Sequence, residues 1–498
     1  MDKKFYITTT LPYINADPHI GFALELIQAD VIARYHKLLG KEVFFNTGTD
    51  EHGVKVYRAA LEEKKNIQAY VDEYAAKFRA LKEALNINWT NFIRTTNPQH
   101  IIACQEFWKR CFANGDIYKK NYKIKYCTGC ELEKTDSELN EQGKCPIHPN
   151  LEIEEREEEN YFFRFSKYQK PLLELYNKNP DFVLPDFRFN EIINFVKQGL
   201  RDFSISRLKE KMPWGVPVPG DEDHVMYVWF DALINYISTL GWPNDEKKFK
   251  DFWPGIQIAG KDNLRQQSAM WQAMLMSAGL PTSKQILIHG FITADGQKIS
   301  KSLGNVVNPF EVAKKYGIDS VRYYLLREIP SDEDGDFSYE KLEARYNGDL
   351  ANNLGNLVSR VAKLIETRLD SELVFKEKFL DSDIKDRTVQ TKENCEIAVN
   401  KFKLHEALAK IWELFDYANA YIDENKPWID VSEHPEHFLK TITSLVYLII
   451  NTAKMLWPFL PGTAEKIYRT FDYDGKTEDL EGYKFKVIKI EPLFPRLK

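Results

Sequence analysis

The sequence predicts an α/β protein with a parallel sheet, an insertion within that sheet and an all-helical region after it. Two stretches alternate strand, helix and strand, which is the pattern of parallel strands joined by helical crossovers. The stretch between them carries a cysteine cluster, and from residue 346 onward apolar residues recur at helical spacing. Because 498 residues exceed what one hydrophobic core usually serves, we expect several domains.

Composition and charge narrow the class of protein. The chain has 43% hydrophobic and 29% charged residues. No stretch approaches the roughly 20 apolar residues of a membrane helix, so no membrane partner is expected. The start has no apolar core of signal-peptide length, which favours a cytoplasmic protein. A net charge of −6 gives no general attraction to nucleic acid, so DNA is not an expected partner and RNA would need local basic and aromatic patches.

The first strand–helix–strand unit opens the chain. Residues 5–11 are rich in β-branched and aromatic side chains, which predicts a strand. Asp17 and Pro18 are the expected N-cap and first residue of a helix. Apolar residues at spacings of three and four predict that this helix runs over 20–39, and a second strand is expected over 42–46.

The second unit lies far downstream, with a strand expected over 256–259, a helix near 263–278 and a strand over 285–292. Together the two units predict one parallel sheet, whose ligands bind beyond the carboxyl ends of its strands. Further helices are expected over 310–316, 320–327, 350–369, 394–422 and 437–456.

Two motifs at these strand ends suit a polyphosphate. The first helix starts near His19 and Gly21, where free backbone N–H groups and the helix dipole attract anions. His19 adds a hydrogen-bond donor, and Gly21 permits close approach. Lys298 and Lys301 lie on a glycine-flanked loop after the last strand, where they can neutralise charge that develops on phosphates. Either motif alone fits an ordinary capped helix or a solvated charge pair, but together they indicate an enzyme that acts on ATP.

The cysteine cluster has the spacing of a metal site. Cys127 and Cys130 are followed after fourteen residues by Cys145 and His148, with glycines for turns between them. Four soft or borderline ligands in two such pairs predict one closed, tetrahedral Zn²⁺ site, which would be structural because no position stays open. The other three cysteines are expected to be separate buried thiols: Cys104, Cys111 and Cys395.

Polar residues on the C-terminal helices could contact RNA. Asn352, Asn356 and Arg360 follow one another at intervals of four and so share a helix face. Two amides and a guanidinium in line can hydrogen-bond the edges of unstacked bases. Trp428, after Lys426-Pro427, offers an indole on which a base could stack. Taken alone, these residues are better explained as a solvated polar face.

With these segments in place, the sequence resembles the class I aminoacyl-tRNA synthetases and, over nearly its whole length, the methionyl-tRNA synthetases among them. The class signatures H-I-G-H and K-M-S-K-S are matched by His19-Ile20-Gly21-Phe22 and Lys298-Ile299-Ser300-Lys301-Ser302. Leu11-Pro12-Tyr13, residues 48–53 (GTDEHG) and residues 227–232 (YVWFDA) resemble that family's methionine-binding segments.

The resemblance implies a methionine–tRNA ligase that uses ATP with Mg²⁺ to form methionyl-adenylate and loads methionine onto the 3′ end of tRNA(Met), releasing AMP and pyrophosphate. It assigns catalysis to His19, Gly21, Lys298 and Lys301. It assigns ATP binding to His19, Gly21, Glu25, Gly260, Asp262, Lys298 and Lys301. It assigns methionine binding to Leu11, Tyr13, Asp50, Trp229, Ala232, Leu233, Tyr236, Asn263 and Gln267. It assigns one structural Zn²⁺ to Cys127, Cys130, Cys145 and His148, and the anticodon to Asn352, Asn356, Arg360 and Trp428.

The chain departs from the family pattern at two places. Phe22 stands where the family has a polar residue, so we expect His19, Lys298, Lys301 and backbone donors to stabilise the transition state without it. Gln266-Gln267 stands where the family commonly has Phe-His. Gln267 can still donate a weak hydrogen bond to the methionine sulfur.

The resemblance also implies a domain order. It places a Rossmann-type catalytic domain in two halves, 1–115 and 225–308, around a connective insertion with the zinc knuckle at 116–224. A linker that contacts the tRNA stem would cover 309–349, and an all-α anticodon-binding bundle 350–498. The family's C-terminal dimerisation domain has no counterpart in the sequence, so a monomer is expected.

Other functions fit the sequence less well. A sister synthetase for leucine, isoleucine or valine would carry a long editing insertion, and a cysteine-specific one would place its metal in the substrate pocket. A non-catalytic tRNA-binding relative would be expected to have lost His19, Lys298 or Lys301. A simple nucleotidylyltransferase would lack the helical region after residue 346.

Overall fold

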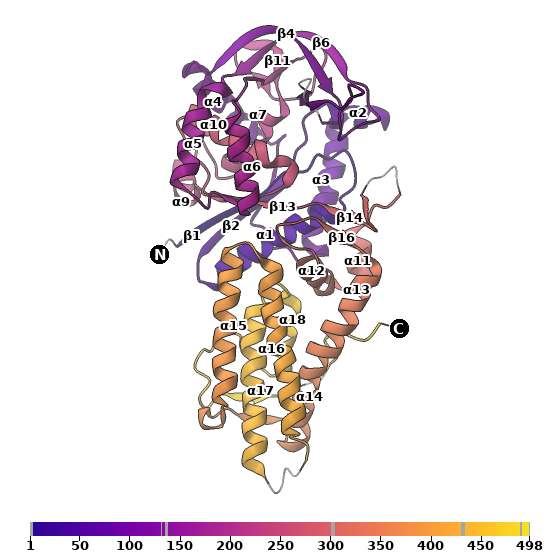
Figure 1. Ribbon diagram of the computed structural model, residues 1–498, viewed down its shortest axis with the longest axis vertical. Coiled ribbons are helices and arrows are strands. Elements are labelled where there is room, and N and C mark those ends of the chain that lie inside the picture. The colour runs from indigo at the N-terminus through magenta and orange to yellow at the C-terminus, as the bar shows by residue number, and fades with distance from the viewer. Residues whose placement is uncertain are drawn as a thin grey trace. The chain divides into compact units, whose positions relative to one another are not determined.

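The computed structural model describes residues 3–130, 132–134, 138–299, 304–429, 434–488 and 491–497. The chain forms two compact units (Figure 1). The first comprises Met1–Pro18, Gly40–Lys82 and Asn88–Ile288, and the second His19–Leu39, Glu83–Ile87 and His289–Lys498. Among the helices of the described residues, none combines the length and apolar character needed to cross a bilayer.

The first unit is built on a six-stranded sheet with the order β3-β2-β1-β12-β13-β7. The pairs β2–β3, β1–β2, β1–β12 and β7–β13 are parallel, as the alternation of strands and helices predicts. Side chains of the central strands are buried, since helices cover such a sheet on both faces. The strands are β1 (Lys4–Thr9), β2 (Glu42–Thr49), β3 (Asn91–Arg94), β7 (Val183–Leu184), β12 (Ile256–Gly260) and β13 (Gln285–His289).

Large aromatic side chains fill the core between the helices of this unit. Phe107 stacks on Trp271 with ring centroids 5.7 Å apart, and Trp108 meets Phe230 edge-on at 5.3 Å. All four rings are buried. The helices are α2 (Val54–Glu62), α3 (Ile67–Ala84), α4 (Pro98–Ala113), α5 (Gln169–Lys178), α6 (Asp186–Lys197), α7 (Val228–Ala232), α8 (Asn235–Ser238), α9 (Glu246–Phe252) and α10 (Trp271–Ser277).

The region expected as an insertion forms two small antiparallel sheets, β5-β4-β6-β8 and β10-β11-β9. A long hairpin of β4 and β6 dominates the first, and the cysteine cluster follows the end of β4 (Figure 1). The region also contributes the two-residue strand β7 to the edge of the parallel sheet. The strands are β4 (Ile117–Cys127), β5 (Leu132–Lys134), β6 (Glu154–Phe163), β8 (Phe203–Ser204), β9 (Ser206–Leu208), β10 (Pro217–Val218) and β11 (Asp221–Met226).

The second unit joins α1 (Ile20–Leu38) to a helical region. Arg322 of α12 is fully buried and lies 2.8 Å from the Asp30 carboxylate of α1, and it also donates to the Phe459 carbonyl at 2.7 Å. Besides α1, the helices of the second unit are α11 (Pro309–Tyr316), α12 (Ile318–Arg327), α13 (Tyr339–Arg345), α14 (Asn356–Arg368), α15 (Ser382–Asn400), α16 (Leu404–Asn425), α17 (Pro435–Leu456) and α18 (Pro461–Thr470).

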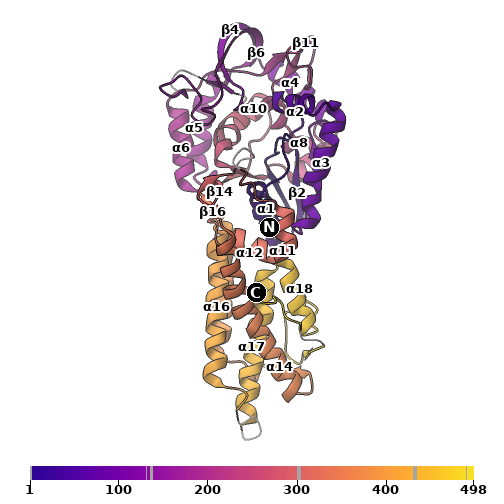
Figure 2. The ribbon, with the colours of Figure 1, turned by 90° about the vertical axis from the view of Figure 1, so that its right-hand side faces the viewer.

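Helices α14 to α18 pack side by side, which confirms a helical bundle in the C-terminal region (Figure 1; Figure 2). A small sheet of β14 (Ile292–Ala294), β15 (Gln297–Lys298) and β16 (Gly335–Phe337) precedes them in the same unit. The short strands β17 (Glu372–Val374) and β18 (Lys484–Lys486) pair beside the bundle.

Three local predictions were wrong. The N-cap of α1 is His19 in extended backbone, not Asp17, because the His19 ring accepts from the Gly21 amide. The helix expected over 394–422 is broken after residue 400, where Phe402 adopts a positive φ of 60°. The strand expected over 285–292 splits at Gly290, where a Cβ would lie 2.0 Å from the Glu333 carbonyl oxygen.

Candidate active site

The segments expected to bind methionine meet in the first unit. Tyr13 and Asp50 form an isolated parallel bridge, in which the Asp50 amide donates to the Pro12 carbonyl at 3.0 Å. The Tyr13 ring meets Trp229 edge-on, with centroids 6.4 Å apart. Asp50 is only 3% exposed, so its carboxylate is shielded from bulk water. A buried carboxylate beside aromatic rings suits a ligand with an ammonium group and an apolar side chain.

The chain after Trp229 supplies an apolar wall. Ala232, Leu233 and Tyr236 are buried on and after α7. The Trp229 indole N–H is buried and has no hydrogen-bond partner within the described part of the chain. Such a donor is costly unless a ligand or water accepts from it, so this wall has the character of a binding surface rather than of a finished core.

Gln267 lies in a buried amide network. Its Nε2 donates to the Tyr236 hydroxyl at 2.7 Å, and its Oε1 accepts from Gln257 Nε2 at 3.2 Å. Only 1% of Gln267 is exposed. The structure therefore commits one donor of the Gln267 amide to Tyr236, the residue expected to line the methionine side-chain pocket.

The remaining expected ligands of this unit lie near the ends of β1 and β12. Leu11 follows β1 and is half-buried. Gly260 is the last residue of β12, and Asp262 and Asn263 form the turn after it. The Asn263 amide donates to the Asp262 carboxylate at 3.2 Å. Asp262 is exposed, and these residues lie at the carboxyl end of a central strand, where such sheets bind ligands.

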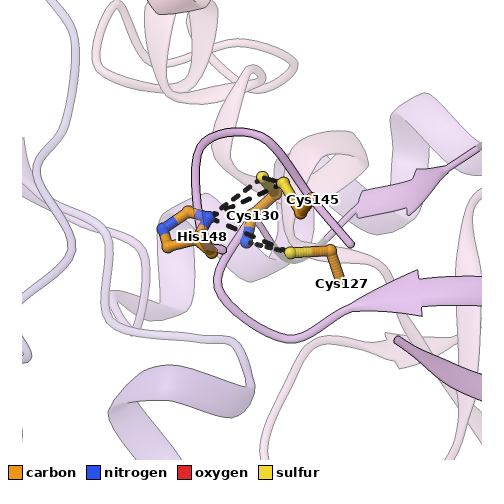
Figure 3. Close-up of side chains that lie close together, drawn as sticks. All are labelled: Cys127, Cys130, Cys145 and His148. Carbon is orange, nitrogen blue, oxygen red and sulfur yellow. Dashed lines mark hydrogen bonds between the residues drawn. The ribbon is translucent and has the colours of Figure 1, made fainter. Parts of the chain in front are cut away.

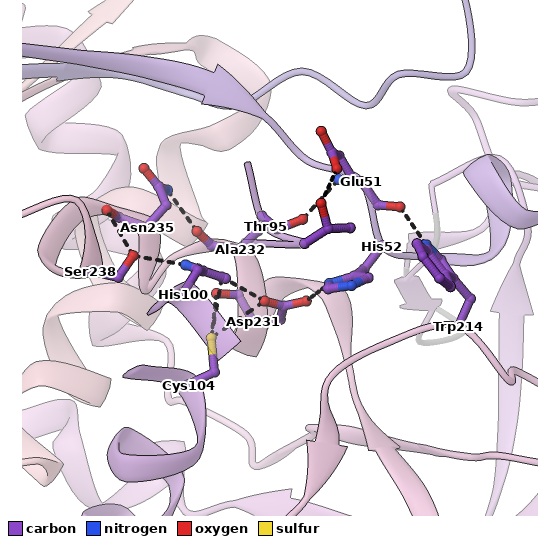
Figure 4. Close-up of polar contacts among 11 residues, drawn as sticks. Glu51, His52, Thr95, His100, Cys104, Trp214, Asp231, Ala232, Asn235 and Ser238 are labelled. Atoms are coloured by element: carbon purple, nitrogen blue, oxygen red, sulfur yellow. Dashed lines mark hydrogen bonds and ion pairs between the residues drawn. The ribbon is translucent and has the colours of Figure 1, made fainter. Parts of the chain in front are cut away.

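A buried carboxylate ties the Asp50 segment to the Trp229 segment. Asp231 accepts from His52 at 2.6 Å through one oxygen and from His100 at 2.8 Å through the other (Figure 4). His100 also contacts the Ser238 hydroxyl at 2.8 Å and the Cys104 thiol at 3.2 Å. Asp231 lies between Trp229 and Ala232, and His52 lies two residues after Asp50. The carboxylate thus links two sides of the expected methionine pocket.

The charges in this cluster are fixed by its surroundings. Burial by itself would raise the pKa of the Asp231 carboxyl, but the charge of His52 and hydrogen bonds from His100 and His52 hold that pKa well below its ordinary value. Burial raises the pKa of the Cys104 thiol well above its ordinary value, and the Asp231 charge adds to the effect. Asp231 is therefore an anion and Cys104 a neutral thiol at neutral pH.

The first signature and the segment after the second lie in the other unit. The His19 Nδ1 accepts from the Gly21 amide at 3.1 Å, and the Ile20 amide donates to the Val307 carbonyl at 3.0 Å. Glu25, on the next turn of α1, is buried and pairs with His289 Nε2 at 2.9 Å. The start of α1 is therefore joined to the chain that follows the lysine loop.

The lysine loop itself is only partly described. Lys298 pairs through its backbone with Thr293 of β14, which fixes the start of the loop. Lys301 lies outside the described residues.

The cysteine quartet converges as its spacing predicts. Cys127, Cys130, Cys145 and His148 offer ligand atoms that all lie within 4.8 Å of one another (Figure 3). The Cys130 Sγ is 3.3 Å from the Cys145 Sγ and 3.3 Å from the His148 Nδ1, and the Cys127 Sγ is 3.9 Å from that nitrogen. Tetrahedral zinc separates such ligand atoms by roughly 3.5–3.8 Å, so this Cys₃His set fits Zn²⁺.

The residues expected to read an anticodon are on the surface of the second unit. Asn352 and Asn356 are exposed, and Trp428 is 40% exposed. The Arg360 guanidinium lies 5.2 Å from the Trp428 ring centroid and 2.6 Å from the Asp423 carboxylate. The Trp428 indole is thus exposed, as stacking of a base on it would require.

Sequence reasoning missed the Asp231 cluster. His52 and Asp231 lie in segments 48–53 and 227–232, which resemble the family's methionine-binding segments. Their partner His100 lies on α4, outside any motif. The one available signal was that Asp231 is a charged residue within the otherwise largely apolar segment 227–232.

Comparison with known proteins agrees with this geometry. Residues 5–152 and 148–362 match the family described as tRNA synthetases class I (M), and residues 381–494 match the anticodon-binding domain of tRNA ligase. The methionine–tRNA ligase of Thermotoga maritima is 43% identical over 99% of this chain and 80% of its own length. That of Thermosynechococcus vestitus is 41% identical over 95% of this chain and 91% of its own.

Solved structures give the same result. The methionyl-tRNA synthetase of Mycobacterium tuberculosis in complex with methionyl-adenylate superposes with a TM-score of 0.95 and 37% identity, over 99% of this chain and all of the other. Its free form superposes with a TM-score of 0.87 at 34% identity, over 100% of this chain and 99% of the other. The chain belongs to the methionyl-tRNA synthetase family of class I tRNA synthetases.

Proposed function

We propose that this chain is a methionine–tRNA ligase. It activates L-methionine with ATP to methionyl-adenylate and pyrophosphate, then transfers methionine to the 3′ end of tRNA(Met) and releases AMP. The observation that carries this proposal is the meeting of Tyr13, Asp50 and Trp229, which brings the segment of a buried carboxylate next to two partly buried aromatic residues.

The methionine end of the reaction follows from the chemistry of that site. Asp50 binds the ammonium group, since a buried carboxylate gains most from an opposite charge. Leu11, Tyr13, Trp229, Ala232, Leu233 and Tyr236 surround the thioether, a flexible and polarizable group that packs well on aromatic and apolar walls. Asn263, in the turn after β12, also contacts methionine, and Gln267 borders the sulfur, held in place by its hydrogen bond to the Tyr236 hydroxyl.

The residues proposed for ATP come from several segments of the sequence. Backbone amides at the start of α1, with His19 and Gly21, bind phosphate oxygens. Lys298 and Lys301 neutralise the charge that develops as the methionine carboxylate displaces pyrophosphate. Gly260 and Asp262 take the adenosine, with Asp262 accepting from ribose hydroxyls, and Glu25 supports the α1 side through His289. Mg²⁺ accompanies ATP by neutralising its phosphates.

The other partners follow from the rest of the chain. The quartet of Cys127, Cys130, Cys145 and His148 holds a structural Zn²⁺. Asn352, Asn356, Arg360 and Trp428 read the anticodon by amide hydrogen bonds and stacking. We propose a cytoplasmic monomer whose domain boundaries fall at residues 115, 224, 308 and 349.

Charging of tRNA tests this proposal. Purified protein should attach labelled methionine to tRNA(Met), and the same tRNA with its CAU anticodon replaced should be a far poorer substrate. Labelled leucine or isoleucine should not be attached to either. Equal charging with leucine, or no dependence on the anticodon, would contradict the proposal.

A further inference from the structure

The hairpin that begins the lysine loop is short and depends on its neighbour. It consists of β14 and the two-residue strand β15, joined by Asp295 and Gly296. Both turn residues have a positive φ, 50° and 73°, as tight hairpin turns require. An isolated hairpin is at best marginally stable in water, and this one has only two residue pairs. Its position must therefore be set by the structure that it packs against.

The strand β16 provides that support, and Asp336 is its central residue. β16 runs parallel to β14, with Asp336 opposite Thr293. One oxygen of the carboxylate, Oδ1, accepts from the Thr293 hydroxyl at 2.6 Å and from the Gly296 amide at 2.8 Å. The Asp295 amide donates to the Phe337 carbonyl at 3.2 Å. Both amides of the turn are therefore bonded to β16, and the Asp336 side chain holds one of them.

Thr293 connects this carboxylate to the first lysine of the loop. In the sheet order β15-β14-β16, the Thr293 backbone pairs with Lys298 on one side, and its hydroxyl donates to Asp336 on the other. Asp336 is half-buried, and hydrogen bonds to an ionised acceptor are roughly twice as strong as those between neutral groups. Loss of the carboxylate would therefore release the turn and the strand that leads to Lys298.

We propose that Asp336 is a positioning residue for adenylate formation, because it fixes the backbone from which Lys298 extends. It acts through Lys298, whose charge must meet the phosphates as negative charge develops on them. A misplacement of about 1 Å in such a group can lower a rate about 100-fold. The inference rests on the proposed function, since it is the ATP-dependent reaction that gives Lys298 this task.

Pyrophosphate exchange at varied methionine and varied ATP tests the proposal. Asp336→Ala removes the acceptor of both hydrogen bonds and should lower kcat about tenfold to 100-fold. The KM for methionine should stay within about twofold of wild type, since Thr293 and Gly296 lie in no segment proposed to bind methionine. Asp336→Asn should retain at least about one third of kcat, because its amide keeps an oxygen that can accept both bonds.

A double-mutant cycle with Lys298→Ala distinguishes positioning from a general loss of stability. A positioning residue acts only through the group that it positions. In the Lys298→Ala background, Asp336→Ala should therefore lower kcat by less than about threefold.

Asp474→Ala is the matched control, because Asp474 caps another turn of the second unit in the same way. Its carboxylate accepts from the Lys476 and Thr477 amides at 2.8 and 2.9 Å and from the Thr477 hydroxyl at 2.7 Å. This variant should keep the wild-type kcat in exchange, however much it lowers the melting temperature.

Thr293→Val is a second, milder variant that keeps the proposal testable if Asp336→Ala does not fold. It removes the hydroxyl donor and keeps a side chain of similar shape. We expect a loss in kcat of about threefold, the size of one net hydrogen bond, and this loss should disappear in the Lys298→Ala background.

Three outcomes would overturn the inference. Asp336→Ala could keep the wild-type kcat, its full loss could persist in the Lys298→Ala background, or Asp474→Ala could lose as much. Failure of the proposed function is distinguishable, since the wild-type protein itself would then show no methionine-dependent exchange.

Discussion

Single side chains decide which polar groups the methionine pocket offers. Gln267 stands where the family commonly has histidine, and its amide joins Tyr236 to Gln257 inside the protein. Gln257 in turn accepts from the Ser283 hydroxyl at 2.6 Å. Because every member of such a network is buried, removing one leaves its partners unsatisfied.

Replacing Gln267 by methionine keeps the side-chain length and removes the amide. Gln267→Met should lower the free energy of unfolding by about 1–3 kcal/mol, since the Tyr236 hydroxyl and Gln257 amide lose a partner. It should also raise the KM for methionine in pyrophosphate exchange. Urea unfolding and exchange kinetics measure the two effects.

The neighbouring Gln266 provides the control. It is 6% exposed, and its Oε1 has no hydrogen-bond partner among the described residues. Gln266→Met should therefore leave stability unchanged or slightly raised. If the two substitutions destabilised the protein equally, the Gln267 network would have no special role.

Among the elements, Asp231 joins the segment after β2, helix α4 and helix α7. Its two oxygens accept from different histidines, so an amide in its place can accept from only one of them. Since Asp50 and Trp229 flank the two ends of this link, its loss should loosen the methionine pocket rather than the ATP site.

We expect Asp231→Asn to raise the KM for methionine about tenfold or more and to change the KM for ATP much less, because a buried charged hydrogen bond contributes about 1.5–3 kcal/mol. Pyrophosphate exchange at varied methionine and varied ATP measures both constants. Asp221→Asn is the matched control, since Asp221 lies 3.2 Å from His224 and 2.7 Å from Lys119 in the insertion. An equal rise of both KM values in Asp231→Asn, or a methionine effect in the control, would contradict the role of this link.

The zinc knuckle is a second element whose role can be isolated. His148→Ala should reduce bound zinc from about one ion per chain to a small fraction, because three ligands no longer close a tetrahedral site. Proteolysis within the following segment, 128–152, should then become rapid. Cys395→Ala should retain its zinc, since that buried thiol donates to the Ala407 carbonyl in the helical bundle. Full zinc content in His148→Ala would show that the quartet is not the site.

At the scale of the whole molecule, the residues proposed for methionine and for the anticodon belong to different compact units. A change at the anticodon residues should therefore affect tRNA charging and spare amino-acid activation. Trp428 is the aromatic residue among those proposed for the anticodon, and its exposed ring lies 5.2 Å from the Arg360 guanidinium.

Trp428→Ala should lower kcat/KM for tRNA(Met) about tenfold, because base–aromatic stacking contributes about 1–3 kcal/mol. Methionine-dependent exchange should stay unchanged. Ile397→Ala removes another exposed apolar side chain from the same bundle and should affect neither reaction. A fall in exchange in Trp428→Ala, or charging equal to wild type, would exclude this site from anticodon recognition.

The central strands, α1 and the helical bundle could be predicted because their apolar residues follow strand or helix periodicity over many positions. The zinc quartet could be predicted because all four ligands lie in two short pairs. The two-residue strand β7 and the break at Phe402 carry no periodic signal, and the cap at His19 depends on its own ring. The Asp231 cluster could not be predicted as a whole, since only the fold brings its residues together from distant parts of the sequence.

The central claim is that the buried Asp50 carboxylate and its aromatic walls select methionine. Pyrophosphate exchange into ATP, measured for wild type and Asp50→Asn with each amino acid in turn, tests it most directly. Wild-type exchange should require methionine, and Asp50→Asn should lose about 100-fold in kcat/KM for it, the equivalent of about 2.7 kcal/mol. Exchange supported equally by leucine or isoleucine, or an Asp50→Asn variant as active as wild type, would contradict the account.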